Sequence, residues 1–122
     1  MEIVTSFGDI KDELHKRSVE LADDGGVLEP LIRELWIRAS NGVPGSDVRL
    51  DSVEEVAYAF IERQQPASAA VEQVLRAGRA LVEIGEGTDR LDAAAVTRLR
   101  QLVDRSAVDV GRAIESGRSS RR

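Results

Sequence analysis

Residues 92–116 read DAAAVTRLRQLVDRSAVDVGRAIES, and this stretch decides the fold. Its nonpolar side chains recur every three or four residues, which is typical of one buried face of an amphipathic helix. The members of this face are Val96, Leu99, Leu102, Val103, Ala107, Val110 and Ile114. A helix of about 25 residues is about 37 Å long, and Gly117 is expected to end it. We therefore predict a long C-terminal helix as the largest element of the chain.

Four shorter helices are predicted before it, over residues 6–25, 29–41, 52–64 and 67–84. Pro30 suits the first turn of the second helix, and Ser52 with Glu55 three positions later has the pattern of a capping box. Pro66 separates the third helix from the fourth. The strand candidates, residues 1–5 and 48–50, are both short. These signals predict an all-α fold, a compact bundle of about five helices.

The chain has 122 residues, of which 42% are hydrophobic and 32% are charged. This length and composition favour a single folded domain, which we place at residues 1–116. The remaining residues 117–122, GRSSRR, are expected to form a flexible basic tail. No nonpolar run approaches the roughly 18 residues of a membrane helix, and no signal peptide is recognisable. The sequence therefore predicts a cytoplasmic protein with no membrane partner.

The long helix is expected to extend beyond a bundle that contains the helices at 29–41 and 52–64, which are only about 20 Å long. Its C-terminal half, from Val103 onward, is therefore a candidate for packing on a second copy or on another partner. The alternative is a bend or break near Gly111. In the preceding helix, Gly78 lies within the nonpolar face, which indicates a close crossing of two helices. The other members of this face are Val71, Val74, Leu75, Leu81 and Val82. We expect a homo-oligomer on these grounds.

Charge is distributed unevenly along the chain, although the formal net charge is −5. Residues 1–62 carry 14 acidic and 6 basic side chains, whereas residues 63–122 carry 8 acidic and 11 basic ones. An acidic protein is repelled by nucleic acid unless its cations gather on one face. The second half of the chain therefore matters more for a nucleic-acid partner than the total does. The contrast between the halves also favours head-to-tail association.

Catalytic patterns are nearly absent from the sequence. The chain has no cysteine, and His15 is its single histidine. Zinc–thiolate sites, two-histidine metal motifs and nucleophile–histidine–acid triads therefore lack their parts. No glycine-rich phosphate loop occurs, and a carboxylate metal site would need acidic residues to converge inside the bundle. We predict a protein that is not an enzyme, with no cofactor and no metal.

Several nonpolar or aromatic side chains fall outside the predicted buried faces. Ile37 projects opposite the buried face of its helix, and Trp36 lies at the edge of that face. Either this helix is central in the bundle, or both side chains reach a partner. Tyr58 lies opposite the buried face of the 52–64 helix, with Glu54 and Glu62 one turn away on either side. This arrangement favours contact with a basic partner, because tyrosine is enriched at interfaces.

Val108 likewise lies opposite the buried face of the long helix. The six candidate protein-binding residues are therefore Trp36, Ile37, Glu54, Tyr58, Glu62 and Val108. They favour a non-catalytic protein–protein interaction or assembly module, of bacterial or phage origin. Within this class the sequence does not separate an antitoxin or immunity-type inhibitor from an adaptor, a small chaperone or a virion-type structural subunit. The expected partner is another protein, a second copy of the chain, or both.

The alternative hypothesis is a helix-turn-helix DNA-binding regulator formed by the 52–64 and 67–84 helices. Arg76 and Arg79 would then face a groove of the DNA. On the long helix, Arg98, Arg105 and Arg112 recur every seven residues and so lie along one ridge that would follow the phosphates. Several acidic residues lie among these arginines, which makes nucleic acid the less favoured partner.

Overall fold

The computed structural model describes residues 27–42, 50–87 and 91–120. The helices in these ranges are α3 (Glu29–Asn41), α4 (Ser52–Glu62), α5 (Ala67–Gly87) and α6 (Ala93–Ser120). No strand occurs in the described residues, which confirms the all-α class. Four helices are described where about five were predicted. The predicted helix at 6–25, the strand candidate at 1–5 and most of that at 48–50 lie outside these ranges.

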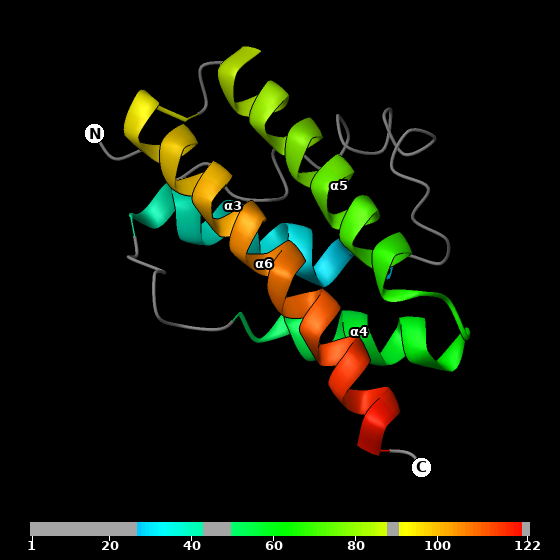
Figure 1. Cartoon of the computed structure of the whole chain (residues 1–122). Coiled ribbons are helices and arrows are strands. Elements are labelled where there is room, and N and C mark those ends of the chain that lie inside the picture. The colour runs from blue at the N-terminus through cyan, green and yellow to red at the C-terminus, as the bar shows by residue number, and fades with distance from the viewer. Residues whose placement is uncertain (1–26, 43–49, 88–90, 121–122) are drawn as a thin grey trace.

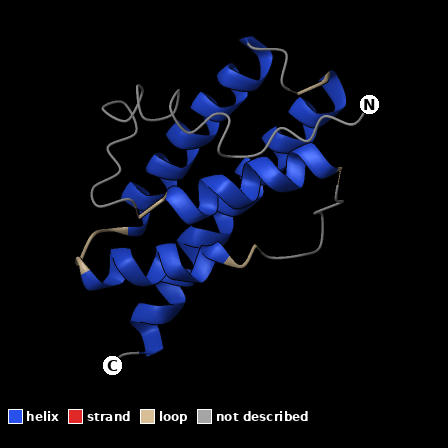
Figure 2. Ribbon diagram, turned by 180° about the vertical axis from the view of Figure 1, so that it is seen from behind, coloured by secondary structure: helices blue, strands red, loops and turns tan. Residues whose placement is uncertain are grey.

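The helices form two layers (Figure 1, and from behind in Figure 2). In one layer α5 and α6 run antiparallel, side by side, and they share the most extensive contact in the molecule. In the other layer α3 crosses the N-terminal half of α6, and α4 crosses its C-terminal half. Arg98 of α6 accordingly reaches the carbonyl of Ala39 in α3, whereas Gly117 faces Ile61 of α4.

Two short helices thus cover one long helix, because they lie across it one after the other. As a result, the nonpolar face of α6 is buried as far as Ile114, and α6 passes Gly111 without a break. The expectation that the shorter helices leave this face uncovered from Val103 onward is therefore wrong, and so is the alternative of a break near Gly111. α6 also continues past Gly117, its predicted end, to Ser120. The division into a domain at 1–116 and a flexible tail at 117–122 stays a prediction.

The core is built from the buried faces of all four helices. Trp36 is fully buried and is the largest of the side chains that have almost no exposed surface. The faces predicted for α3 and α6 are buried as expected, and so is most of the face predicted for α4. None of the described helices has both the length and the nonpolar character needed to cross a membrane.

Gly78 marks the closest approach of α5 to α6, as its place in the nonpolar face predicts. A Cβ atom added at Gly78 would lie 2.2 Å from Cγ1 and 2.9 Å from Cβ of Val103. These distances leave no room for any side chain. The side chain of Val103 in α6 therefore packs directly against the backbone of α5 at Gly78.

The connection from α4 to α5 is a tight helix end followed by a proline. The N–H of Gln64 donates to the carbonyl of Ile61, and the N–H of Gln65 donates to that of Phe60. This is the Schellman pattern, in which a left-handed residue ends the helix. Gln64 has that conformation, with φ of 57°, in a position that usually holds glycine. The helix predicted to reach Gln64 therefore ends at Glu62.

Candidate protein-interaction surfaces

The first candidate surface is the outer face of α4. Val53, Val56, Ala57 and Phe60 are buried on the inner face of this helix. Tyr58 consequently points outward, and 59% of its surface is exposed. Glu54 and Glu62 are exposed as well, one turn before and one turn after it. We call Glu54, Tyr58 and Glu62 the acidic ridge. An aromatic ring held between two carboxylates on a helix fits a surface that is both nonpolar and cationic.

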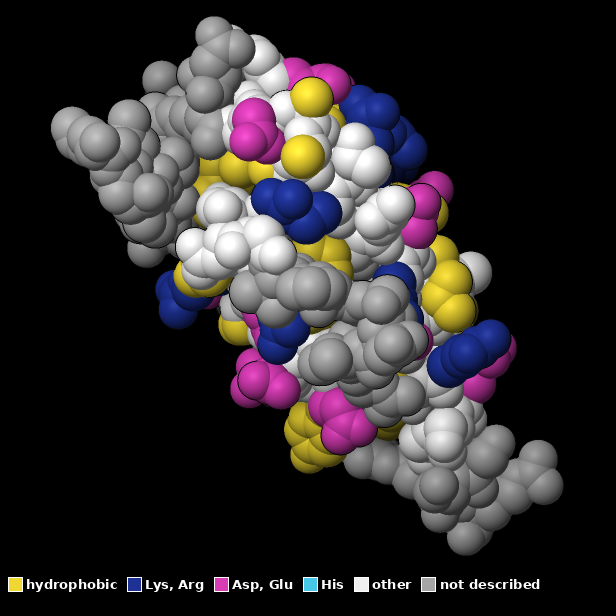
Figure 3. Space-filling view, turned by 90° about the vertical axis from the view of Figure 1, so that its left-hand side faces the viewer, with side chains coloured by type: hydrophobic (Ala, Val, Ile, Leu, Met, Phe, Trp, Pro, Cys, Tyr) yellow, Lys and Arg dark blue, Asp and Glu magenta, His cyan; other side chains and the backbone are white. Residues whose placement is uncertain are grey.

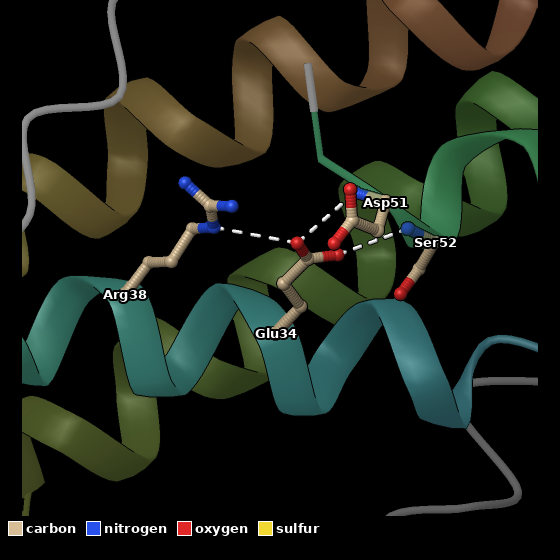
Figure 4. A network of polar contacts seen from close by, with 4 residues as sticks. All are labelled: Glu34, Arg38, Asp51 and Ser52. Atoms are coloured by element: carbon tan, nitrogen blue, oxygen red, sulfur yellow. Dashed lines mark hydrogen bonds and ion pairs between the residues drawn. The ribbon is translucent and has the colours of Figure 1, made fainter. Parts of the chain in front are cut away.

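The orientation of α4 depends on Glu34 of α3 (Figure 4). The two carboxylate oxygens of Glu34 accept hydrogen bonds from the backbone N–H groups of Asp51 and Ser52, each at 3.0 Å. Arg38, one turn further along α3, donates from Nε to the same carboxylate at 3.3 Å. A carboxylate at a helix N-terminus satisfies unpaired N–H groups and is favoured by the helix dipole. Glu34 thus caps α4 from a neighbouring helix.

This cap differs from the predicted one. The residue that precedes α4 is Asp51, and no side-chain cap bond is formed by it. The capping box expected between Ser52 and Glu55 is therefore replaced by Glu34, which lies 17 positions before Asp51 and accepts the hydrogen bond from its N–H. A local pattern of residues cannot predict such a cap, since its acceptor becomes a neighbour only through folding.

The Glu34 carboxyl has a lowered pKa. Burial by itself raises this pKa. Burial is outweighed by hydrogen bonds from the backbone of Ser52 and Asp51, by a hydrogen bond from the Ser52 side chain, and by the charge of Arg38. A folded-state pKa below the unfolded one stabilises the fold at neutral pH. That contribution is present above the ordinary glutamate pKa and is lost as the pH falls through the folded-state value.

We expect Glu34→Gln to lower the free energy of unfolding by about 1–2 kcal/mol at pH 7, the usual range for a lost helix cap. The difference from the wild type should shrink as the pH falls from the ordinary glutamate pKa of about 4.3 through the lower folded-state value, because Glu34 is protonated first in the unfolded chain and then in the folded one. Urea denaturation at several pH values measures this difference. Asp104→Asn is the matched control, since Asp104 is exposed on α6. A Glu34→Gln effect that does not change with pH would contradict the charged cap.

The second candidate surface is a groove between α5 and α6, with a volume of about 780 Å³. Val71, Leu75 and Val108 line it together with Gly111. Val108 is 50% exposed, and Val71 and Leu75 are partly exposed. The absence of a side chain at position 111 helps to open the groove. A Cβ atom added there would already lie 3.0 Å from Cγ2 of Val71. We call this feature the α5/α6 groove.

Charged side chains border the α5/α6 groove on both helices. Three of them are basic, Arg76, Arg79 and Arg112, and two are acidic, Glu72 and Glu115. Arg76 pairs with Glu72 at 4.0 Å. Arg79 and Arg112 are exposed, and within the described ranges neither has an ion-pair or hydrogen-bond partner. The groove therefore combines a nonpolar floor with two guanidinium groups that are available to a partner's carboxylates.

Sequence reasoning missed Val71 and Leu75 as surface residues. It placed both in the buried face of α5 with Val74, Leu81 and Val82. The structure buries those three and also Ala70, Ala77 and Ile84, whereas Val71 and Leu75 are only partly buried against the core. The buried face of α5 is therefore shifted toward its alanines.

The structure separates Trp36 from Ile37. Trp36 is fully buried in the core, so the interpretation of Trp36 as an interface residue is wrong, and the central placement of its helix explains it. Ile37 is 39% exposed. Among the described residues, the exposed large hydrophobic side chains are Ile37, Tyr58 and Val108, on α3, α4 and α6 respectively.

The arginines proposed for nucleic acid do not form a single strip. Arg98 is partly buried, and its guanidinium donates to the carbonyl of Ala39 at 2.9 Å and 3.2 Å, so it holds the end of α3. Arg105 pairs with Asp109 at 3.7 Å. Arg76, Arg79 and Arg112 meet instead at the α5/α6 groove. On the face seen in Figure 3, basic and acidic side chains are interspersed, with hydrophobic atoms between them.

In the part of the chain that the structure describes, no group of three or more His, Cys, Asp or Glu residues is placed to hold a metal ion. His15 lies outside the described residues. Comparisons of the chain with protein families, with curated proteins and with solved structures found no match.

Proposed function

We propose that the chain is a non-catalytic protein-interaction or assembly module, whether as an antitoxin or immunity-type inhibitor, an adaptor, a small chaperone or a virion-type structural subunit. The observation that carries the proposal is Tyr58, 59% exposed on the outer face of α4 between two exposed carboxylates. The fold does not require an aromatic side chain at this outward-facing position, since the inner face of α4 is already filled. A cytoplasmic location, a bacterial or phage origin and self-association belong to the same proposal.

The α5/α6 groove supports the proposal independently. Its volume falls within the range of about 300–1,000 Å³ that is common for binding clefts, and its floor is nonpolar. Within the described residues nothing packs over Val108. Grooves of this kind between helices bind helices or protruding side chains of other proteins. Ile37, exposed on α3, is a further candidate contact.

A DNA-binding regulator remains the alternative proposal. Its support is the convergence of Arg76, Arg79 and Arg112 on the α5/α6 groove. Glu72 and Glu115 border the same groove, and Arg98 is engaged within the fold. If DNA is the partner, its affinity should fall at least about tenfold between 50 and 200 mM salt.

We expect Tyr58→Ala and Ile37→Asp to reduce the recovery of a partner in native co-purification with the tagged chain, while helicity by circular dichroism stays unchanged. Tyr58→Phe should retain the partner, because the ring supplies most of the contact area. Thr97→Ala, at an exposed site on α6, is the matched control. Unchanged recovery with both Tyr58→Ala and Ile37→Asp would overturn these contacts. If the chain instead bound duplex DNA with the salt dependence given above, the DNA-binding alternative would be favoured.

A further inference from the structure

The acidic ridge and the α5/α6 groove have complementary chemistry and belong to different layers of the molecule. The ridge is on α4, behind α6 in Figure 1, and the groove is between α5 and α6 in the other layer. No residue of α4 lines the groove. One chain therefore carries two complementary surfaces, and within its described residues these surfaces do not contact each other.

We infer that the acidic ridge of one copy docks into the α5/α6 groove of another copy. This inference rests on the proposed function and names the partner as the chain itself. The ring of Tyr58 would then cover Val71, Leu75 and Val108, which removes nonpolar surface of both copies from water. The carboxylates of Glu54 and Glu62 would approach Arg79 and Arg112, whose guanidinium groups have no partner among the described residues.

The dimensions of the two surfaces agree. Glu54 and Glu62 are eight residues apart, about 12 Å along α4. Gly111 lies against Val71, so its neighbour Arg112 is near the level of Val71, and Arg79 is eight residues, about 12 Å, further along α5. A second hollow, lined by Gly78, Val82 and Val103, adjoins the groove through Leu75 and Arg79 and extends it along α5 and α6. An exposed helix ridge thus meets a groove between two helices, which is the usual geometry of helix packing.

The contact joins unlike surfaces, so it is head-to-tail. Each copy has one ridge and one groove, and successive copies form a closed ring or an open chain. A two-fold dimer in which each ridge meets the partner's groove would need ridge and groove on one face of the molecule, whereas they belong to different layers. A two-fold dimer of ridge on ridge would bring four carboxylates together, which would repel one another. The uneven charge of the sequence, with an acidic excess over residues 1–62 and a basic excess over residues 63–122, agrees with the contact of an acidic ridge with a basic groove.

The test is a mixing experiment on the full chain, followed by light scattering and sedimentation velocity. Tyr58→Ala removes the ring from the ridge, and Val108→Asp places a carboxylate on the floor of the groove. Both positions are exposed, and circular dichroism verifies that both variants fold. The wild type should have a mass above 13.3 kDa that rises with concentration. Each variant alone should associate at least about tenfold more weakly, as expected when a central aromatic contact or its pocket is lost.

An equal mixture of the two variants should recover a dimer and nothing larger. The intact groove of the Tyr58→Ala chain accepts the intact ridge of the Val108→Asp chain. The ridge of the first chain and the groove of the second are both defective, so no third chain can be added. Charge reversal gives a second pair: Glu54→Arg with Glu62→Arg in one chain, and Arg79→Glu with Arg112→Glu in the other. These chains should associate only with each other. Thr97→Ala should behave as the wild type does.

A mixture that stays monomeric would overturn head-to-tail docking, and so would a wild type that is monomeric at every concentration. If Val108→Asp also destabilised such a monomer, another part of the same chain would be covering the groove. A monomeric wild type that still loses a different protein partner through Tyr58→Ala would refute only this inference and leave the proposed function standing. If Tyr58→Ala reduced neither self-association nor the recovery of a partner, both the inference and the proposed function would be refuted.

Discussion

Replacing Trp36 with alanine should lower the free energy of unfolding by about 3–5 kcal/mol, the usual cost of truncating a large buried aromatic side chain. Trp36 has no exposed surface, and it packs at the centre of α3 among leucines that are buried as well. The loss has two parts, because nonpolar surface no longer leaves water on folding and a cavity remains in the core. Since domains of this size have total stabilities of about 5–15 kcal/mol, the change is a large fraction of the whole.

Urea denaturation followed by circular dichroism measures this loss, at one fixed protein concentration because self-association also stabilises the folded state. Trp36→Phe, which leaves a smaller cavity, should cost less than Trp36→Ala. Ile37→Ala is the matched control, since Ile37 is the next residue and is 39% exposed. It should change stability by less than about 1 kcal/mol. Equal effects at positions 36 and 37 would contradict the burial of one and the exposure of the other.

Gly78→Ala should destabilise the domain by about 2–3 kcal/mol, a typical cost of overpacking. Alanine favours a helix over glycine by about 1 kcal/mol, so the steric cost exceeds a gain in helix propensity. The added Cβ atom would lie 2.2 Å and 2.6 Å from the two methyl carbons of Val103. It would also lie 2.9 Å from Cβ of Val103, so a change of side-chain rotamer does not relieve the clash. α5 and α6 would have to move apart.

Gly87→Ala is the matched control for this steric argument. Gly87 is also in α5, and a Cβ atom added there meets nothing within 4 Å. We expect this variant to be as stable as the wild type or slightly more stable. Val103→Ala should partly rescue Gly78→Ala, with a coupling of about 1–3 kcal/mol in a double-mutant cycle. A Gly78→Ala protein with wild-type stability would contradict the close approach of the two helices.

Local signals in the sequence predicted α3 completely and most of the other described helices. Pro30 and Gly42 define α3, since proline suits a first helical turn and glycine takes the left-handed conformation at its end. The buried face of α6 follows its nonpolar period. Exposure of Tyr58 and Val108 follows from the same periodicity, because both lie opposite a buried face. Local propensity and helical period are enough for these features.

Features that depend on distant residues were not predictable in this way. The cap of α4 comes from Glu34, and the buried face of α5 is shifted toward its alanines. For the same reason Val71 and Leu75 were assigned to the core, and the α5/α6 groove was not foreseen. The covering of α6 by α3 and α4 depends on how two short helices are arranged across a long one. The helical period predicts which face of each helix is buried, but it does not predict which neighbouring helix covers that face.

The central claim is that the chain leaves nonpolar side chains on its surface in order to associate with a protein, in the first place with itself. The most direct measurement is the molar mass of the wild-type chain by light scattering over a concentration series, in parallel with Tyr58→Ala. The account predicts a wild-type mass that rises above 13.3 kDa with concentration and declines on addition of salt, and a Tyr58→Ala chain that remains near 13.3 kDa. Masses near 13.3 kDa for both chains at every concentration, with no protein partner recovered by either, would contradict it.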